Sequence, residues 1–226
     1  MSADPASVLD PAGREKLRTV LALLAVERAS VSSVVDQRAW QVHVLDSLTG
    51  LEVGDLREAT RIADVGAGAG FPGLALAVAL PAAQIDLVES VGRKCDFMRR
   101  AIEAAAIPNA TVLNLRSEDL ASSAGRESYD LVTARAVGRL STLAELASPL
   151  LKPNGTLIAW KGKRDQEEEE QLERASEALA MHQEKVLAVG DRAGSQHRHL
   201  HIIRKTAETP AGLPRRPGMA KKRPKG

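Results

Sequence analysis

Residues 62–73 read Ile-Ala-Asp-Val-Gly-Ala-Gly-Ala-Gly-Phe-Pro-Gly, and this stretch decides the fold. A short apolar strand that contains Asp64 runs into alternating glycines, and an apolar helical stretch follows at 74–80. A strand that leads through a glycine-rich turn into a helix is typical of a nucleotide-type binding unit. Glycine suits such a turn because it lets the backbone approach a ligand closely and adopt conformations closed to other residues.

The spacing of the glycines separates two kinds of binding unit. A dinucleotide fingerprint requires a third glycine at position 71, where this chain has Phe71, so a nicotinamide-dependent dehydrogenase is disfavoured. The pattern D-x-G-x-G-x-G, with Gly66 and Gly68 in the loop, resembles motif I of the S-adenosylmethionine-dependent methyltransferases. The resemblance implies S-adenosylmethionine as the cofactor. The alternative is a glycine-rich turn that binds nothing, because likeness of fold is a weak warrant for function.

A carboxylate at the end of the next strand supports a ligand site. Residues 85–89 read Ile-Asp-Leu-Val-Glu, and Glu89 lies about 20 residues after the glycine loop, where an acid can accept hydrogen bonds from ribose hydroxyls. A solvated charge at a strand end is the alternative for Glu89.

Apolar segments with the lengths of strands and helices alternate along most of the chain. This alternation predicts an α/β fold with a mostly parallel sheet, helices on both faces and an N-terminal helical extension. Together with the alternation, the resemblance of the glycine loop implies a Rossmann-like class I S-adenosylmethionine-dependent methyltransferase. The last two strands are expected to pair as an antiparallel edge. We predict strands at 61–65, 85–89, 110–115, 129–134, 156–160, 185–189 and 199–204, and helices at 15–29, 36–50, 72–80, 92–106, 139–151 and 165–180.

Composition sets the domain boundaries. We predict a flexible N-terminus at 1–14, a methyltransferase domain at 15–206 and a basic, disordered tail at 207–226, which carries four prolines, many charges and few apolar residues. The domain divides into the helical extension 15–58 and the Rossmann-like core 59–206.

The chain has 226 residues, of which 44% are hydrophobic and 2% aromatic, so its core must consist of Ala, Val, Leu and Ile. A lone cysteine, Cys95, excludes an internal disulfide and a cysteine-cluster metal site, and we expect no metal. No secretory signal is visible, and the apolar run 20–26 is too short to span a membrane. We expect a soluble, cytoplasmic monomer.

The net charge of +2 hides an asymmetry along the chain. Residues 204–226 hold eight Lys and Arg side chains and one acid, whereas the rest of the chain is mildly acidic. A basic tail on an acidic body points to a nucleic-acid partner.

Three further stretches of sequence indicate which family of methyltransferases the chain resembles. They are Val-His-Val-Leu-Asp-Ser at 42–47, Thr-Ala-Arg-Ala at 133–136 and Trp-Lys-Gly at 160–162, and they join the Gly-Phe-Pro-Gly at 70–73. Together they resemble the glucose-inhibited division protein B family, also called RsmG, over roughly residues 15–204. The resemblance implies methylation of N7 of one guanine in the 16S ribosomal RNA of the small ribosomal subunit.

The family's cofactor contacts can be carried over one residue at a time. Its loop contacts match Gly66 and Phe71, and its adenine-side contacts match Ser117 and Glu118. Its arginine at the end of the fourth strand matches Arg135. Each has a structural alternative: a core contact for Phe71, a helix cap for Ser117 and Glu118, and a salt bridge for Arg135.

The chain departs from the family pattern at two places. Val42 stands where family members often have Arg, and Ser30-Val31-Ser32 stands where they commonly show Asn-Leu-Thr. If these residues contact RNA, that part of the substrate surface differs. The neighbouring His43 is interpreted as a structural residue rather than a catalytic one.

Guanine N7 is a lone-pair acceptor that carries no proton, so the reaction needs no general base. We therefore expect no catalytic acid or base, and positioning of the reacting atoms instead. Arg135 and Lys161 sit at adjacent strand ends and are predicted to hold the guanine or a nearby phosphate. The expected substrate is an RNA loop or a partly assembled particle, because duplex RNA hides N7. Two alternatives stay open: a methyltransferase of the same fold acting on a small molecule, and a non-catalytic ribosome-assembly RNA-binding protein.

Overall fold

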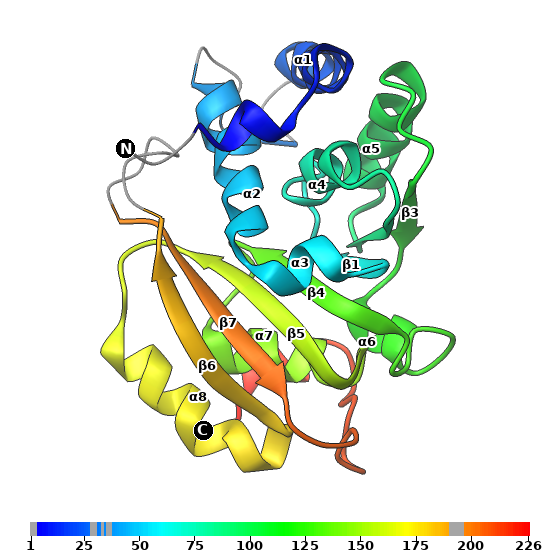
Figure 1. Ribbon diagram of the computed structural model, residues 1–226. Coiled ribbons are helices and arrows are strands. Elements are labelled where there is room, and N and C mark those ends of the chain that lie inside the picture. The colour runs from blue at the N-terminus through cyan, green and yellow to red at the C-terminus, as the bar shows by residue number, and fades with distance from the viewer. Residues whose placement is uncertain (1–3, 28–30, 33, 35–37, 190–196) are drawn as a thin grey trace.

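The computed structural model describes residues 4–27, 31–32, 34, 38–189 and 197–226. Within them a seven-stranded sheet has the order β3-β2-β1-β4-β5-β7-β6 (Figure 1). Neighbouring strands from β3 to β5 are parallel, and β7 is antiparallel to both β5 and β6. The predicted mostly parallel sheet and the predicted antiparallel edge are thus confirmed. The strands are β1 Arg61–Val65, β2 Gln84–Glu89, β3 Ala110–Asn114, β4 Tyr129–Arg135, β5 Leu151–Lys161, β6 Met181–Ala188 and β7 His199–Lys205.

Helices cover both faces of the sheet (Figure 1). One face carries α1 Pro11–Val26, α2 Asp46–Leu48, α4 Gly73–Ala79 and α5 Gly92–Ala104, and the other carries α7 Leu140–Ala147 and α8 Gln166–Leu179. Shorter elements are η1 Pro5–Val8, η2 Trp40–Leu45, η3 Thr49–Glu52, α3 Gly54–Glu58, α6 Ser117–Ala121 and α9 Met219–Lys222.

The core consists of two apolar clusters, one on each face. Successive residues of a strand point to opposite faces, so Ile62 of β1 joins one cluster and Ala63 joins the other. Both residues are fully buried, as expected for a parallel sheet that is covered on both sides. The carboxyl ends of the parallel strands are left for a ligand.

The N-terminal region is more ordered than the sequence predicts. Helix α1 begins at Pro11, because the Asp10 side chain caps it by accepting the Gly13 N–H at 2.6 Å. The guanidinium of Arg14 donates to the Ala6 carbonyl at 2.6 Å, and Ala6 is buried. The expected flexibility of residues 1–14 therefore does not describe residues 4–14.

The expected helix at 36–50 is broken up. Residues 35–37 lie outside the described part of the chain, and the remainder forms a π-helical turn, η2, followed by α2 and the 3-10 turn η3. This region packs on the sheet: the Trp160 indole N–H of β5 donates to the Asp46 carbonyl at 2.8 Å. A Cβ at Gly50 would lie 2.5 Å from the Trp160 ring, so glycine is required at this contact.

Residues 207–226, the C-terminal segment, do not form the disordered tail that the composition predicts. Leu213 and Ala220 are buried, and α9 forms near the end. Thr209 donates its backbone N–H to Glu127 at 2.8 Å. The Lys205 ammonium, together with the Thr209 hydroxyl and backbone N–H, lowers the pKa of Glu127 to about 2. The prediction was wrong because it weighed average composition, whereas a few specific contacts hold this segment.

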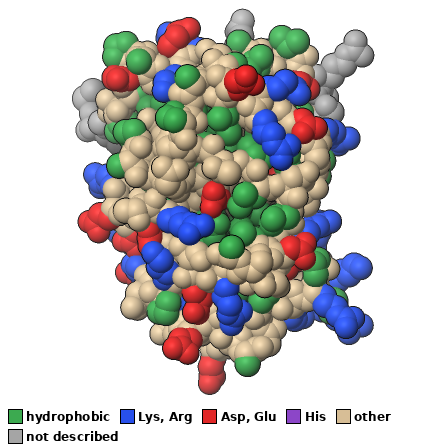
Figure 2. All heavy atoms as spheres, turned by 90° about the vertical axis from the view of Figure 1, so that its right-hand side faces the viewer, with side chains coloured by type: hydrophobic (Ala, Val, Ile, Leu, Met, Phe, Trp, Pro, Cys, Tyr) green, Lys and Arg blue, Asp and Glu red, His purple; other side chains and the backbone are tan. Residues whose placement is uncertain are grey.

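The surface carries charges of both signs. On the face shown in Figure 2, Lys and Arg side chains are interspersed with Asp and Glu side chains, and hydrophobic side chains gather near the middle. Within the described ranges, no helix is long and apolar enough to cross a membrane.

Candidate cofactor site

A buried carboxylate fixes the glycine loop. Asp64, near the end of β1, accepts the Gly73 N–H at 2.9 Å and the Thr133 hydroxyl at 2.9 Å. These bonds tie the start of α4 and the neighbouring strand β4 to β1. Burial raises the pKa of Asp64 to about 6 despite both hydrogen bonds.

The loop glycines adopt left-handed backbone conformations. Gly66 has φ +70°, and a Cβ there would lie 2.6 Å from Val137 Cγ2. Gly68 has φ +61° and donates its N–H to Glu89 at 3.1 Å. Because L-residues with side chains rarely adopt such φ values, the loop depends on glycine at both positions.

Glu89, at the end of β2, is oriented by two backbone donors. One carboxylate oxygen accepts from Gly68, and the other accepts the Val91 N–H at 2.8 Å. The residue is 7% exposed and lines the pocket described next. An oriented carboxylate with lone pairs to spare is suited to ribose hydroxyls.

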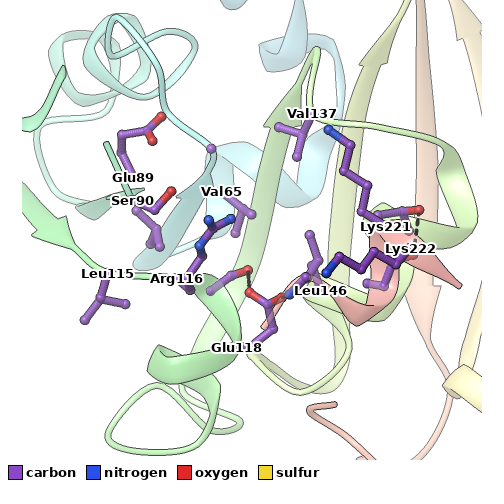
Figure 3. Close-up of a pocket in the computed structure, with 16 residues that line it drawn as sticks. Val65, Glu89, Ser90, Leu115, Arg116, Glu118, Val137, Leu146, Lys221 and Lys222 are labelled. Atoms are coloured by element: carbon purple, nitrogen blue, oxygen red, sulfur yellow. Dashed lines mark hydrogen bonds between the residues drawn. The ribbon is translucent and has the colours of Figure 1, made fainter. Parts of the chain in front are cut away.

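A pocket of about 440 Å³ opens beside these strand ends (Figure 3). Gly66 and Glu89 line it from the ends of β1 and β2, and Ser117 and Glu118 line it from α6. We call this cavity the donor pocket. Its position at the carboxyl ends of parallel strands is where open α/β sheets bind ligands.

Ser117 and Glu118 form the far end of the donor pocket. The Ser117 hydroxyl donates to one carboxylate oxygen of Glu118 at 3.2 Å. The other oxygen accepts the backbone N–H of Gly218, from the C-terminal segment, at 2.8 Å. The carboxylate is thus shared between the pocket and that segment.

Phe71 does not line the donor pocket. Its ring is buried and stacks on the His43 ring, with centroids 5.0 Å apart. The His43 Nε2 lies 2.9 Å from the Val34 carbonyl, and burial lowers the pKa of His43. A neutral ring that donates from Nε2 leaves Nδ1 free to accept from Arg135, whose Nη2 lies 3.4 Å away.

Arg135, at the end of β4, binds the helical extension. Its guanidinium donates to Asp46 at 2.9 Å and to the Val42 carbonyl at 3.0 Å. Asp46 is 1% exposed, and the Nε of Arg198 lies 2.7 Å from its second oxygen. The salt-bridge alternative thus describes the contacts of Arg135. Arg135 contacts Val42 through the backbone carbonyl, so the presence of Val rather than Arg at position 42 does not alter this hydrogen bond.

Lys161, at the end of β5, is also paired. Its ammonium donates to Glu168 at 2.6 Å and to the Gly138 carbonyl at 2.9 Å. The same Glu168 oxygen accepts the Leu140 N–H at the start of α7 at 2.8 Å. Glu168 is therefore a buried link between β5, α7 and α8.

The structure divides the predicted site residues into two groups. Gly66, Glu89, Ser117 and Glu118 meet around the donor pocket, with Gly68 bonded to Glu89. Arg135, Phe71 and Lys161 lie outside its lining. The cofactor and guanine contacts assigned to these residues stay predictions.

The sequence interpretation missed three partners: Asp46, Glu168 and the C-terminal segment. Each buried or half-buried cation at a strand end requires a carboxylate partner, which was the available signal for the two acids. Of the departures, Ser32 donates its hydroxyl toward the Val34 carbonyl at 3.3 Å, whereas Ser30 lies outside the described residues. In the described part of the chain, no group of three or more His, Cys, Asp or Glu side chains is arranged to hold a metal ion.

Solved structures share this architecture. A SAM-dependent methyltransferase from Aquifex aeolicus matches with a TM-score of 0.57 at 17% identity, over 76% of this chain and 94% of that chain. Fibrillarin from Aeropyrum pernix, in complex with natively bound S-adenosyl-L-methionine, matches with a TM-score of 0.58 at 13% identity, over 74% and 76% of the two chains. At these identities the likeness shows the fold alone, which is the Rossmann-like methyltransferase fold.

Sequence comparison identifies the family within this class. The chain belongs to the rRNA small subunit methyltransferase G family, GidB, whose model matches residues 16–201. The ribosomal RNA small subunit methyltransferase G of Rubrobacter xylanophilus is 41% identical over 186 residues, 80% of this chain and 71% of that protein. The Bacillus subtilis protein of the same name is 34% identical over 200 residues, 88% and 84% of the two chains. The family predicted from the four motifs is confirmed.

Proposed function

We propose that this protein transfers a methyl group from S-adenosylmethionine to N7 of a guanine in the 16S ribosomal RNA of the small ribosomal subunit. The observation that carries the proposal is the donor pocket, with Glu89 oriented by the backbone N–H groups of Gly68 and Val91, in a chain that belongs to this family. The name of the relatives supports the substrate, and the resemblance in the motifs supports the guanine and its N7 atom. A cytoplasmic location and a monomeric state stay predictions.

The residues of the donor pocket fit S-adenosylmethionine. A side chain at Gly66 would meet Val137, so glycine allows the loop and Val137 to pack together where both line the pocket. Glu89 offers carboxylate oxygens to ribose hydroxyls, and Ser117 with Glu118 offers polar groups at the adenine end. The sulfonium of the bound cofactor supplies an electrophilic methyl group.

The task of the chain is then to position the nucleophile. N7 of guanine attacks with its own lone pair, so no side chain has to remove a proton. The protein must hold N7 in line with the methyl carbon and sulfur, and exclude competing nucleophiles. We assign the orientation of the guanine to the strand ends that carry Arg135 and Lys161. Because both cations already pair with carboxylates, they act through a preformed network rather than as free charges.

The deciding experiment supplies small ribosomal subunits from cells that lack this protein, together with S-adenosylmethionine tritiated on the methyl group. We expect tritium in 16S ribosomal RNA, recovered as N7-methylguanosine. Label found in a metabolite pool and absent from RNA would favour the small-molecule alternative. Cofactor binding without transfer to either substrate would favour a non-catalytic assembly protein.

A further inference from the structure

The C-terminal segment is anchored beside the donor pocket by one strong ion pair. Arg215 binds Glu145 of α7 through two nitrogens, at 2.5 and 2.6 Å, and Glu145 is 3% exposed. Arg215 also donates to the Arg223 carbonyl at 2.7 Å, which closes the segment into a loop. A bidentate pair with a buried carboxylate is a specific attachment, because a lysine at this position lacks the guanidinium geometry.

From this anchor the segment reaches the donor pocket. Gly218 has φ +82° and donates its N–H to Glu118 at 2.8 Å. The Thr142 hydroxyl donates a hydrogen bond to the Ala220 carbonyl at 3.3 Å. Gly218, Ala220 and the two following lysines therefore line the pocket, although the sequence interpretation placed this segment outside the folded domain.

The segment faces the ribose side of the pocket across the cavity. In Figure 3, Lys221 and Lys222 lie on the side opposite Glu89 and Ser90, and Lys221 extends toward Val137. Val137 is the side chain that a Cβ at Gly66 would meet, so Lys221 extends toward the glycine loop. Lys221 and Lys222 thus face Glu89 and Arg116 across the pocket.

We propose that Gly218 and residues 220–222 form a wall of the methyl-donor pocket and that Arg215 is a positioning residue for cofactor binding. This inference rests on the proposed function, since it takes S-adenosylmethionine as the ligand. Arg215 is not itself among the residues that line the cavity. It acts through Gly218 and Glu118: when the anchor is released, the wall opens and Glu118 loses its backbone donor.

The chain offers a matched pair of variants. Arg215 and Arg216 are neighbours of equal charge, but Arg216 is exposed whereas Arg215 is anchored to Glu145. Isothermal titration of the full-length protein with S-adenosylmethionine should show Kd raised on the order of tenfold in Arg215→Ala, the loss expected for a broken hydrogen-bonded contact. Arg216→Ala should bind like the unaltered protein. In the methylation assay KM for the cofactor should rise while kcat changes little, which a general loss of stability would not produce.

Equal Kd values in both variants and the unaltered protein, with melting curves showing all three folded, would overturn the inference. If Arg215→Ala fails to fold, Arg215→Lys replaces it, because it keeps the charge and loses the bidentate geometry; an unchanged Kd there overturns the inference equally. Absence of cofactor binding by the unaltered protein would instead contradict the proposed function.

A second measurement needs no variant. Trypsin can cut after Lys221 and Lys222, both of which are exposed at the pocket. A ligand that contacts the segment must stabilise it by mass action, so saturating S-adenosylmethionine should slow cleavage at these bonds. Cleavage at the same rate with and without the cofactor would contradict the inference.

Discussion

Gly68 combines a left-handed backbone conformation, which glycine adopts without strain, with a hydrogen bond to Glu89. A Cβ there would have the Gly66 carbonyl oxygen as its nearest neighbour, at 3.8 Å, so added bulk meets no clash. The obstacle is φ +61°, which costs an L-residue about 1–2 kcal/mol. We expect Gly68→Ala to lower the free energy of unfolding by about that amount and to weaken S-adenosylmethionine binding, because the Gly68 N–H orients Glu89.

Denaturant titration and calorimetry measure the two effects. Gly54→Ala is the matched control, because a Cβ at Gly54 meets nothing within 4 Å and its φ is not positive. If Gly68→Ala binds the cofactor as tightly as the Gly54→Ala control does, the conformation of the loop does not contribute to cofactor binding.

Single residues also show how much of the site could be predicted from the sequence. The place of Glu89 in the pocket was predictable, because it follows from a position at a strand end and a distance along the chain from the glycine loop. The partner of Arg135 was not, because Asp46 lies 89 positions away and meets it through tertiary packing alone. Local patterns identify which side chains stand at the strand ends, and the packing of distant segments decides what those side chains contact.

Between elements, Lys161 of β5 and Glu168 of α8 form a half-buried junction. Lys161→Ala would leave the Glu168 carboxylate with Leu140 as a donor but without its cation. We expect a loss of about 1–3 kcal/mol in the free energy of unfolding, the cost of an undercompensated buried acid. The double variant Lys161→Ala/Glu168→Gln should regain part of it, and exposed Lys163→Ala should change little. Thermal and denaturant melts test this; equal stability of Lys161→Ala and Lys163→Ala would contradict it.

Strand β7, which lies between β5 and the edge strand β6, carries a buried histidine with a measurable pH signature. His201 is 1% exposed, its Nδ1 lies 2.8 Å from the Gln183 side-chain oxygen on β6, and burial lowers its pKa to about 4. The unfolded chain, with an ordinary histidine pKa of about 6.5, binds the proton more readily. His201 therefore contributes stability above pH 6.5 that is lost as pH falls toward 4, by about 3 kcal/mol at most.

The comparison of His201→Gln with the unaltered protein isolates this contribution. Asp64, with its pKa raised to about 6, acts in the opposite direction over a similar range, because its stabilising effect is lost as pH rises toward 6. It is present in both proteins and cancels in the difference. Denaturant unfolding from pH 4 to 7 should show the stability advantage of His201 growing with pH, and a constant difference would refute the assignment.

At the level of elements, most of the sheet was predictable and its boundaries were not. Periodicity located each strand, but β5 begins at Leu151 rather than 156, because pairing with Tyr129 extends it backwards. The helical extension differs more from its prediction than the sheet does. Its structure is determined by the contact of Trp160 with Asp46 and Gly50 rather than by its own hydrophobic periodicity.

In the whole molecule, the asymmetry of charge remains, but the C-terminal segment is folded onto the body rather than extended from it. Part of its charge is neutralised internally, because Arg215 pairs with Glu145. Composition predicted that the segment would be basic, and this holds. It did not predict order, because a buried Leu213 and one ion pair are too few residues to alter an average.

The exposed cations of this segment give the last prediction, on binding of RNA. Arg216 and Arg223 are exposed, and neither lines the donor pocket. Each phosphate contact with single-stranded RNA contributes about 0.7 to the slope of log K against log salt concentration. If both arginines contact phosphates, Arg216→Gln/Arg223→Gln should therefore make that slope shallower by about 1.4. Affinity for S-adenosylmethionine should stay unchanged, because the Arg215 anchor and the pocket lining are intact. Filter binding of 16S ribosomal RNA fragments across a salt series provides the measurement, and parallel lines for the two proteins would show that these arginines do not contact the RNA backbone.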